Sequence, residues 1–148
     1  MTTEIWNPAA RGDSHRNCLV CGSRDPLKLG LVFMADGSGV TATFRANEGL
    51  QGYSGILHGG VTSALLDAVM THCLFHNGIS GLTASLSVRF LEPVPCGADL
   101  VLRARLVRTR PPFFSTASEM LMEGRVLASA TARFLLKPGA LGGDGPVI

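Results

Sequence analysis

The chain has 148 residues, which is the length of one domain. Its residues are 46% apolar and 16% charged, and 13 basic residues against 11 acidic ones give a formal charge of +2. This composition is that of an ordinary globular protein and excludes disorder of the whole chain. The basic residues are dispersed and form no nucleic-acid-binding motif, so we expect no nucleic-acid partner.

The N-terminal residues lack the apolar core of a secretory signal, so we expect a cytoplasmic protein. The longest apolar stretch runs from Val61 to Phe75 and contains Asp67 and His72. It is shorter than the ~20 residues that a membrane span requires. We therefore expect no membrane partner.

Residues 1–27 predict a loop-rich lead-in, because glycine and proline punctuate them and no regular period is sustained. Two alternating apolar runs follow on either side of the turn-forming residues 36–39 and predict a β-hairpin. The apolar positions of the two runs are Leu29, Leu31, Phe33, Val40, Ala42 and Phe44.

The segment from Gly60 to about Asn77 is apolar on nearly every side and precedes Gly78, which is typical of a helix that other structure encloses. Residues 82–90 then alternate between apolar and polar and predict a strand with all its apolar side chains on one face. Thr83 falls on the polar face of this strand.

Three more strands are expected near residues 100–106, 114–122 and 126–134, and residues 138–148 are expected to form a flexible tail. One helix among six strands cannot form an alternating βαβ architecture. We therefore predict an α+β domain over residues 28–137, with a six-stranded antiparallel sheet wrapped around one long central helix. Its unpaired strand edges favour at least a homodimer.

Asp67 is the only acidic residue between Glu48 and Glu92, and it lies in the middle of the apolar helix. Burying a carboxylate without partners costs several kcal/mol or raises its pKa. Two interpretations follow: Asp67 has a chemical function, or it lies on a solvated stripe or bonds a neighbouring backbone group.

His58, Gly59 and Gly60 stand at the start of the helix, where backbone N–H groups lack intrahelical partners and the dipole is positive. A carbonyl oxygen that gains negative charge would be stabilised there, and glycine lets a ligand approach closely. Alternatively, the glycines only permit a tight turn. His58 is a candidate catalytic base, although a hydrogen bond that holds the turn is the favoured interpretation.

Gly59 and Asp67 are eight residues apart in the sequence. At ~1.5 Å per residue, about 12 Å of helix separates them, so one reacting carbonyl cannot touch both in the same chain. Two chains related by a twofold axis, with antiparallel helices, would bring them together. The predicted site is therefore shared across a dimer.

Residues 51–67, QGYSGILHGGVTSALLD, resemble the signature of hotdog-fold acyl-CoA thioesterases of the phenylacetic-acid-degradation (PaaI-like) group. Residues 88–94, residues 124–128 and the lead-in sequence CLVCG at residues 18–22 resemble the same family, and the resemblance covers about residues 17–136. It implies a hotdog fold and hydrolysis of a hydrophobic or aromatic acyl-CoA. We expect the homodimers to pair into tetramers.

The resemblance implies that Asp67 is the nucleophile or general base and that the Gly59 amide polarises the thioester carbonyl. Thr83 matches a residue that helps to position the attacking water. Many relatives have asparagine where this chain has Gly52. The neighbouring Gln51 then holds the water, or orients the loop, or the role is lost.

A thioester needs little activation, so we expect no cofactor and no metal. The pairs His72/His76 and Cys18/Cys21 each lack a third ligand. The candidate walls of a substrate pocket are Tyr53, Met70 and Phe75, with Gly60 allowing close approach. The candidate partners for the phosphates of CoA, which could equally be solvated strand charges, are Arg89, Arg105, Arg108 and Arg110.

Two other functions fit the same residues. The first is a non-catalytic acyl-CoA-binding protein. The second is an enoyl-CoA hydratase-like enzyme, because Asp67 and His72 superficially resemble the hydratase dyad. The residues between them continue a helix where the dyad needs a loop, so the hydratase ranks lower.

Overall fold

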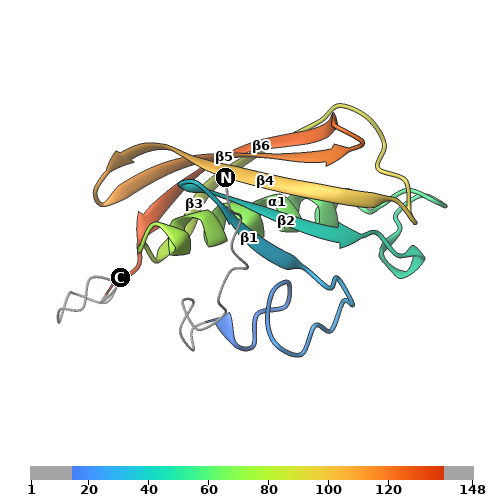
Figure 1. The fold of residues 1–148 in the computed structure, drawn as a ribbon, viewed down its shortest axis with the longest axis horizontal. Coiled ribbons are helices and arrows are strands. Elements are labelled where there is room, and N and C mark those ends of the chain that lie inside the picture. The colour runs from blue at the N-terminus through green and yellow to red at the C-terminus, as the bar shows by residue number, and fades with distance from the viewer. Residues whose placement is uncertain (1–14, 139–148) are drawn as a thin grey trace.

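The computed structural model describes residues 15–138 as one six-stranded antiparallel sheet with one long helix packed across a face (Figure 1). This confirms the predicted architecture. The elements are β1 (Val32–Asp36), β2 (Gly39–Arg45), a short 3-10 helix (Glu48–Leu50), α1 (Gly59–His76), β3 (Gly81–Phe90), β4 (Asp99–Arg110), β5 (Phe113–Met122) and β6 (Arg125–Leu136). The predicted tail and the first half of the lead-in lie outside the described residues.

The strands lie in the order β1-β2-β4-β5-β6-β3, so β1 and β3 form the two edges of the sheet. The helix α1 follows β2 and leads into β3 (Figure 1). It therefore carries the chain along one face of the sheet, from β2 near one edge to β3 at the other edge. No helix within residues 15–138 is long and apolar enough to cross a membrane.

The first strand begins later than its apolar alternation predicts. The expected run over Leu29, Leu31 and Phe33 is wrong for its first half, because β1 starts at Val32. Lys28 and Gly30 adopt left-handed backbone conformations, with φ of +55° and +57°, and these break an extended chain. Leu29 is nevertheless buried, so it contributes to the core from a loop.

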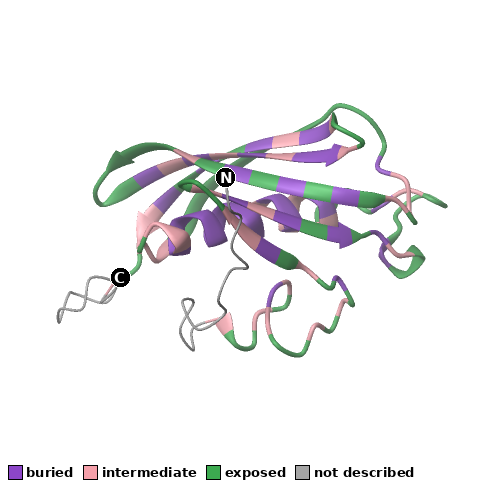
Figure 2. Ribbon diagram, in the orientation of Figure 1, coloured by how far each residue is buried: buried purple, intermediate pink, exposed green. Residues whose placement is uncertain are grey.

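The helix α1 is buried around most of its circumference, as predicted (Figure 2). Phe33 of β1 stacks on His72 with ring centroids 3.7 Å apart, and His15 of the lead-in packs edge-on against Phe75 at 4.9 Å. Burial of each large apolar side chain contributes about 1.5–3 kcal/mol. The buried residues of α1 are Thr62, Leu65, Leu66, Ala68, Val69, Met70, Thr71, His72, Cys73, Leu74 and Phe75.

The strand β3 does not keep one apolar face throughout. Thr83 lies opposite the fully buried Phe134, and Leu86 lies opposite the buried Ala132, so both point toward the helix side of the sheet. The pairing with β6 slips by one residue between Thr83 and Ser85, which is a β-bulge. The prediction that Thr83 shares the polar face is therefore wrong, because the extra residue reverses the alternation.

Candidate active site

The start of α1 is fixed by His58. Its backbone is not helical, and its ring Nδ1 accepts a hydrogen bond of 2.9 Å from the Gly60 N–H. The His58 carbonyl accepts the first helical bond, from the Thr62 N–H, at 3.0 Å. His58 thus acts as the N-cap, which is the turn-holding contact that the sequence favours.

Capping leaves the Gly59 N–H as a donor at the positive end of the helix dipole. This N–H occupies the first helical position and has no hydrogen-bond partner within residues 15–138. A Cβ at position 59 would lie 3.6 Å from the Phe90 ring, so the absence of a side chain keeps the amide approachable beside that ring. The Gly60 N–H, in contrast, is already bonded to His58.

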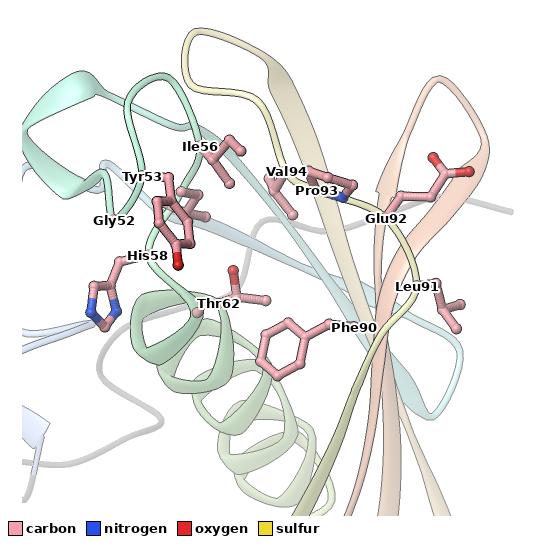
Figure 3. Close-up of a pocket in the computed structure, with 12 residues that line it drawn as sticks. Gly52, Tyr53, Ile56, His58, Thr62, Phe90, Leu91, Glu92, Pro93 and Val94 are labelled. Carbon is pink, nitrogen blue, oxygen red and sulfur yellow. The ribbon is translucent and has the colours of Figure 1, made fainter.

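A cavity of about 650 Å³ opens beside this helix end (Figure 3). The loop before α1, the first turn of α1 and the chain that leaves β3 form its walls (Figure 3). Most of the walls are apolar, which suits an organic ligand with few polar contacts. The lining residues are Gly52, Tyr53, Ile56, Leu57, His58, Gly59, Thr62, Phe90, Leu91, Glu92, Pro93 and Val94.

The loop before the helix is held by Gln51. Its side-chain oxygen accepts a hydrogen bond of 3.0 Å from the Gly55 N–H, and the Gly52 N–H donates to the Ile56 carbonyl at 2.9 Å. A Cβ at Gly52 would lie 3.4 Å from the His58 Cα, so this position is close to the cap residue. Of the predicted roles for Gln51, the contacts favour the orientation of the loop.

Asp67 meets Thr83 on the side of the helix that faces β3. The Thr83 hydroxyl donates a hydrogen bond of 2.8 Å to the Asp67 carboxylate, whose residue is half-buried. Burial raises the pKa of Asp67 above its ordinary value, while the Thr83 hydroxyl and the charge of His15 act to lower that pKa. A carboxylate with a raised pKa is a stronger proton acceptor than a solvated one.

The bulge in β3 creates this contact. Thr83 and Leu86 are three residues apart, so in a regular strand their side chains would lie on opposite faces. The extra residue of the bulge puts both on the face toward the helix. The sequence identifies Thr83 through the family resemblance and gives no signal of the bulge.

A single chain does not unite the two halves of the predicted site. Asp67 is not among the residues that line the cavity beside Gly59. The two residues are eight positions apart along the helix, equivalent to about 12 Å. Of the other candidates, Tyr53 lies exposed at the cavity, while Met70 is fully buried in the core and Arg89 is exposed on β3.

Arg108 and Arg110 line a second cavity of about 640 Å³ on the sheet face opposite α1, together with Arg133. The Arg133 guanidinium lies 4.0 Å from the centroid of the Phe113 ring, which fixes it over that ring. Nothing in the sequence distinguishes Arg133 from other polar residues of the strands. Arg133 lies on the exposed face of β6 and is paired with Ser115 of β5. Ser115 is paired in turn with Arg108 of β4, so the register of the three strands brings Arg133 near Arg108 and Arg110.

Comparison with known proteins decides the family. The profile of the Thioesterase superfamily matches residues 54–129, which is just over half of the chain. The chain belongs to this superfamily. Acyl-coenzyme A thioesterase THEM4 of Bos taurus is 30% identical over 94 residues, covering 62% of this chain and 38% of that protein. Acyl-coenzyme A thioesterase 13 of Homo sapiens is 29% identical over 83 residues, covering 55% of this chain and 59% of that protein.

Among solved structures, a phenylacetic acid degradation-related protein from Ralstonia eutropha is 26% identical, with a TM-score of 0.70 over 86% of this chain and 96% of that one. The sheet and helix therefore form the hotdog fold of the thioesterase superfamily. The chain spans between 38% and 59% of the length of the two curated relatives above. The superfamily match includes the helix start, Asp67 and Thr83, and ends before Arg133.

Proposed function

We propose that this protein is an acyl-CoA thioesterase that hydrolyses a hydrophobic or aromatic acyl-CoA to the free acid and CoA. The single observation that supports this most strongly is the half-buried Asp67 carboxylate, which accepts a hydrogen bond of 2.8 Å from Thr83. The two curated relatives, both named acyl-coenzyme A thioesterases, point to the same reaction class.

In the proposed reaction, Asp67 acts on the thioester carbonyl carbon directly or as the base for a water molecule. As a base, it takes one proton from the water while the oxygen forms the new C–O bond. Thr83 holds the carboxylate in place through its hydroxyl. The C–S bond then breaks, and the CoA thiolate takes up the proton that Asp67 accepted, which restores the carboxylate. If Asp67 attacks directly, the C–S bond breaks to give a mixed anhydride, the CoA thiolate takes a proton from the solvent, and water then hydrolyses the anhydride to the free acid and the Asp67 carboxylate.

The negative charge on the carbonyl oxygen needs a donor that one chain does not place near its own Asp67. We propose that the partner's Gly59 supplies this N–H, because the amide stands at a helix start with no acceptor among residues 15–138 and an apolar cavity lies beside it. Each dimer would then contain two equivalent sites.

The edge strand β3 is the proposed dimer seam. Residues on both of its faces are exposed, and Leu86 and Phe90 expose 38% and 57% of their surfaces on the face toward the helix. An exposed strand with apolar side chains is an edge that another strand can cover. We further propose that the dimers pair into tetramers and that the protein is cytoplasmic, as the sequence analysis expects.

The acyl group is proposed to occupy the cavity between Tyr53 and Phe90, at this seam (Figure 3). The nucleotide of CoA is proposed to meet the basic cavity formed by Arg108, Arg110 and Arg133. Arg133 lies opposite Ser85, two residues from Thr83, so the basic cavity is near the same end of β3, on the sheet face that points away from the helix. The exposed Arg89 lies farther along that strand and is a rim candidate.

The test is release of free thiol from a panel of aliphatic and aromatic acyl-CoA esters by the wild type, Asp67→Asn and Asp99→Asn. Asp99 is a surface carboxylate and serves as the matched control. Hydrolysis by the wild type and the control, and its loss in Asp67→Asn, supports the proposal. Tight binding without hydrolysis would instead identify an acyl-CoA-binding protein, and consumption of an enoyl-CoA without thiol release would identify a hydratase.

A further inference from the structure

The lead-in loop contains three metal-ligating side chains that the thioesterase proposal does not use. His15, Cys18 and Cys21 follow one another at intervals of three residues. The ligand atoms of these three side chains all lie within 4.8 Å of one another, and His15 Nδ1 is 3.4 Å from Cys21 Sγ. They form the one such group of three that residues 15–138 contain.

These distances are close to those of a real coordination sphere. Zinc binds cysteine sulfur at about 2.3 Å and histidine nitrogen at about 2.0–2.1 Å, so neighbouring ligands of a tetrahedral ion are roughly 3.3–3.8 Å apart. The widest separation in this group must therefore shrink by about 1 Å, which a change of side-chain rotamer provides.

The backbone already holds the three side chains together. The Cys18 N–H donates to the His15 carbonyl at 3.1 Å, and the Gly22 N–H donates to the Cys18 carbonyl at 2.9 Å. A Cβ at Gly22 would lie only 2.4 Å from the Cys18 carbonyl oxygen and 2.8 Å from that of Arg16, so this turn accepts no side chain. The loop is thus shaped before any ion binds.

The group also has a defined place in the fold. Cys21 is buried in the core, and His15 packs edge-on against Phe75 near the end of α1. Cys18 and Cys21 are not joined by a disulfide. An ion held here would therefore fix the His15 ring in the position in which it packs against the helix that bears Asp67.

We propose that His15, Cys18 and Cys21 bind one zinc ion that holds this loop in the shape in which it packs against the helix. Two thiolates and one imidazole are donors that suit zinc, and the C-x-x-C spacing is typical of its structural sites. On binding, each cysteine exchanges its S–H bond for a bond to zinc, and the two protons go to the solvent. Water or a further donor completes the tetrahedron. The proposal departs from the expectation of no metal, which rested on Cys18 and Cys21 having no third ligand; the fold brings His15 beside them.

The test uses the full chain without a polyhistidine tag, loaded with zinc and passed through a desalting column. We expect about one zinc per chain by elemental analysis in the wild type and in Cys96→Ser, a control at a cysteine outside the group. Cys18→Ser is expected to bind zinc at least about tenfold more weakly. Circular dichroism of the variant verifies that it is folded.

Cobalt gives a second readout on the wild type, which does not depend on any variant folding. Cobalt in place of zinc is expected to show a thiolate-to-metal charge-transfer band that disappears as the pH falls and the thiols are protonated. A wild type that retains no zinc, or equal retention by the wild type and Cys18→Ser, would overturn the proposal. So would a mass of the metal-free protein lowered by two hydrogens, if proteolytic peptides assign the loss to a Cys18–Cys21 disulfide.

Discussion

Replacing Thr83 with valine removes one hydroxyl and keeps nearly the same shape, so it isolates the hydrogen bond to Asp67. A hydrogen bond to a charged group contributes about 1.5–3 kcal/mol, and the lower end applies here because Thr83 is exposed. About 1.5 kcal/mol corresponds to roughly a tenfold change in the ratio of ionised to protonated Asp67. The bond lowers the pKa of Asp67, so its loss raises that pKa further.

The assay is kcat/KM for one acyl-CoA as a function of pH. The acidic limb of the profile is expected to move to higher pH in Thr83→Val. At a pH on that limb, kcat/KM should fall about tenfold more than it falls on the plateau at higher pH. Thr83→Ser keeps the hydroxyl and should reproduce the wild-type limb. If the Thr83→Val profile has the wild-type shape at every pH, the hydroxyl does not set the ionisation of Asp67 and the reasoning is refuted.

Four further changes test the remaining features. Asp67→Asn is expected to lower kcat by about 10²–10⁴-fold. Because burial raises the pKa of Asp67, the folded state disfavours its carboxylate form, so thermal melts of Asp67→Asn should show no loss of stability at neutral pH. Any gain in melting temperature of Asp67→Asn over the wild type should shrink as the pH falls below that pKa. A melting temperature of Asp67→Asn clearly below that of the wild type at neutral pH would contradict this. Phe90→Glu places a charge among the apolar side chains of the proposed seam, on the helix side of β3, so light scattering should show a smaller assembly and hydrolysis should fall at least about tenfold. A fully active dimer would exclude this seam. Arg133→Gln should raise KM for acyl-CoA about tenfold and leave KM for an acyl-pantetheine, which lacks the nucleotide, unchanged. His58→Ala should lower the free energy of unfolding by about 1 kcal/mol, whereas His58→Asn keeps a capping acceptor and should retain that stability. Loss of activity in both variants at unchanged stability would instead make His58 a catalytic residue.

The order of the elements could be predicted from the sequence because it depends on periodicity and turn chemistry, both of which are local. The buried helix and the two-residue turn at Gly37 and Ser38 are examples. The early start expected for β1 failed because the sequence does not reveal the left-handed backbone of Lys28. Apolar alternation alone cannot distinguish an extended chain from a loop whose apolar side chains reach the core.

The candidate site was predictable where a single residue is conspicuous. Asp67 stands out as an acid in an apolar helix, and the distance of about 12 Å to Gly59 follows from the helical rise alone. Contacts between elements were not predictable in this way. His15 comes next to Cys21 through a turn that depends on Gly22, and Arg133 joins Arg108 only through the register of β4, β5 and β6.

The bulge in β3 has a consequence for how relatives of this chain are aligned. Ala84 is the extra residue between two regularly paired segments of β3. Thr83 faces the helix in the first segment and Leu86 faces it in the second. A homologue with one residue fewer at this point would present the opposite set of side chains to its aspartate, even if every flanking letter were the same. Gap placement around position 84 therefore decides which residue of a relative is matched with Thr83, and an ungapped alignment would transfer the wrong one.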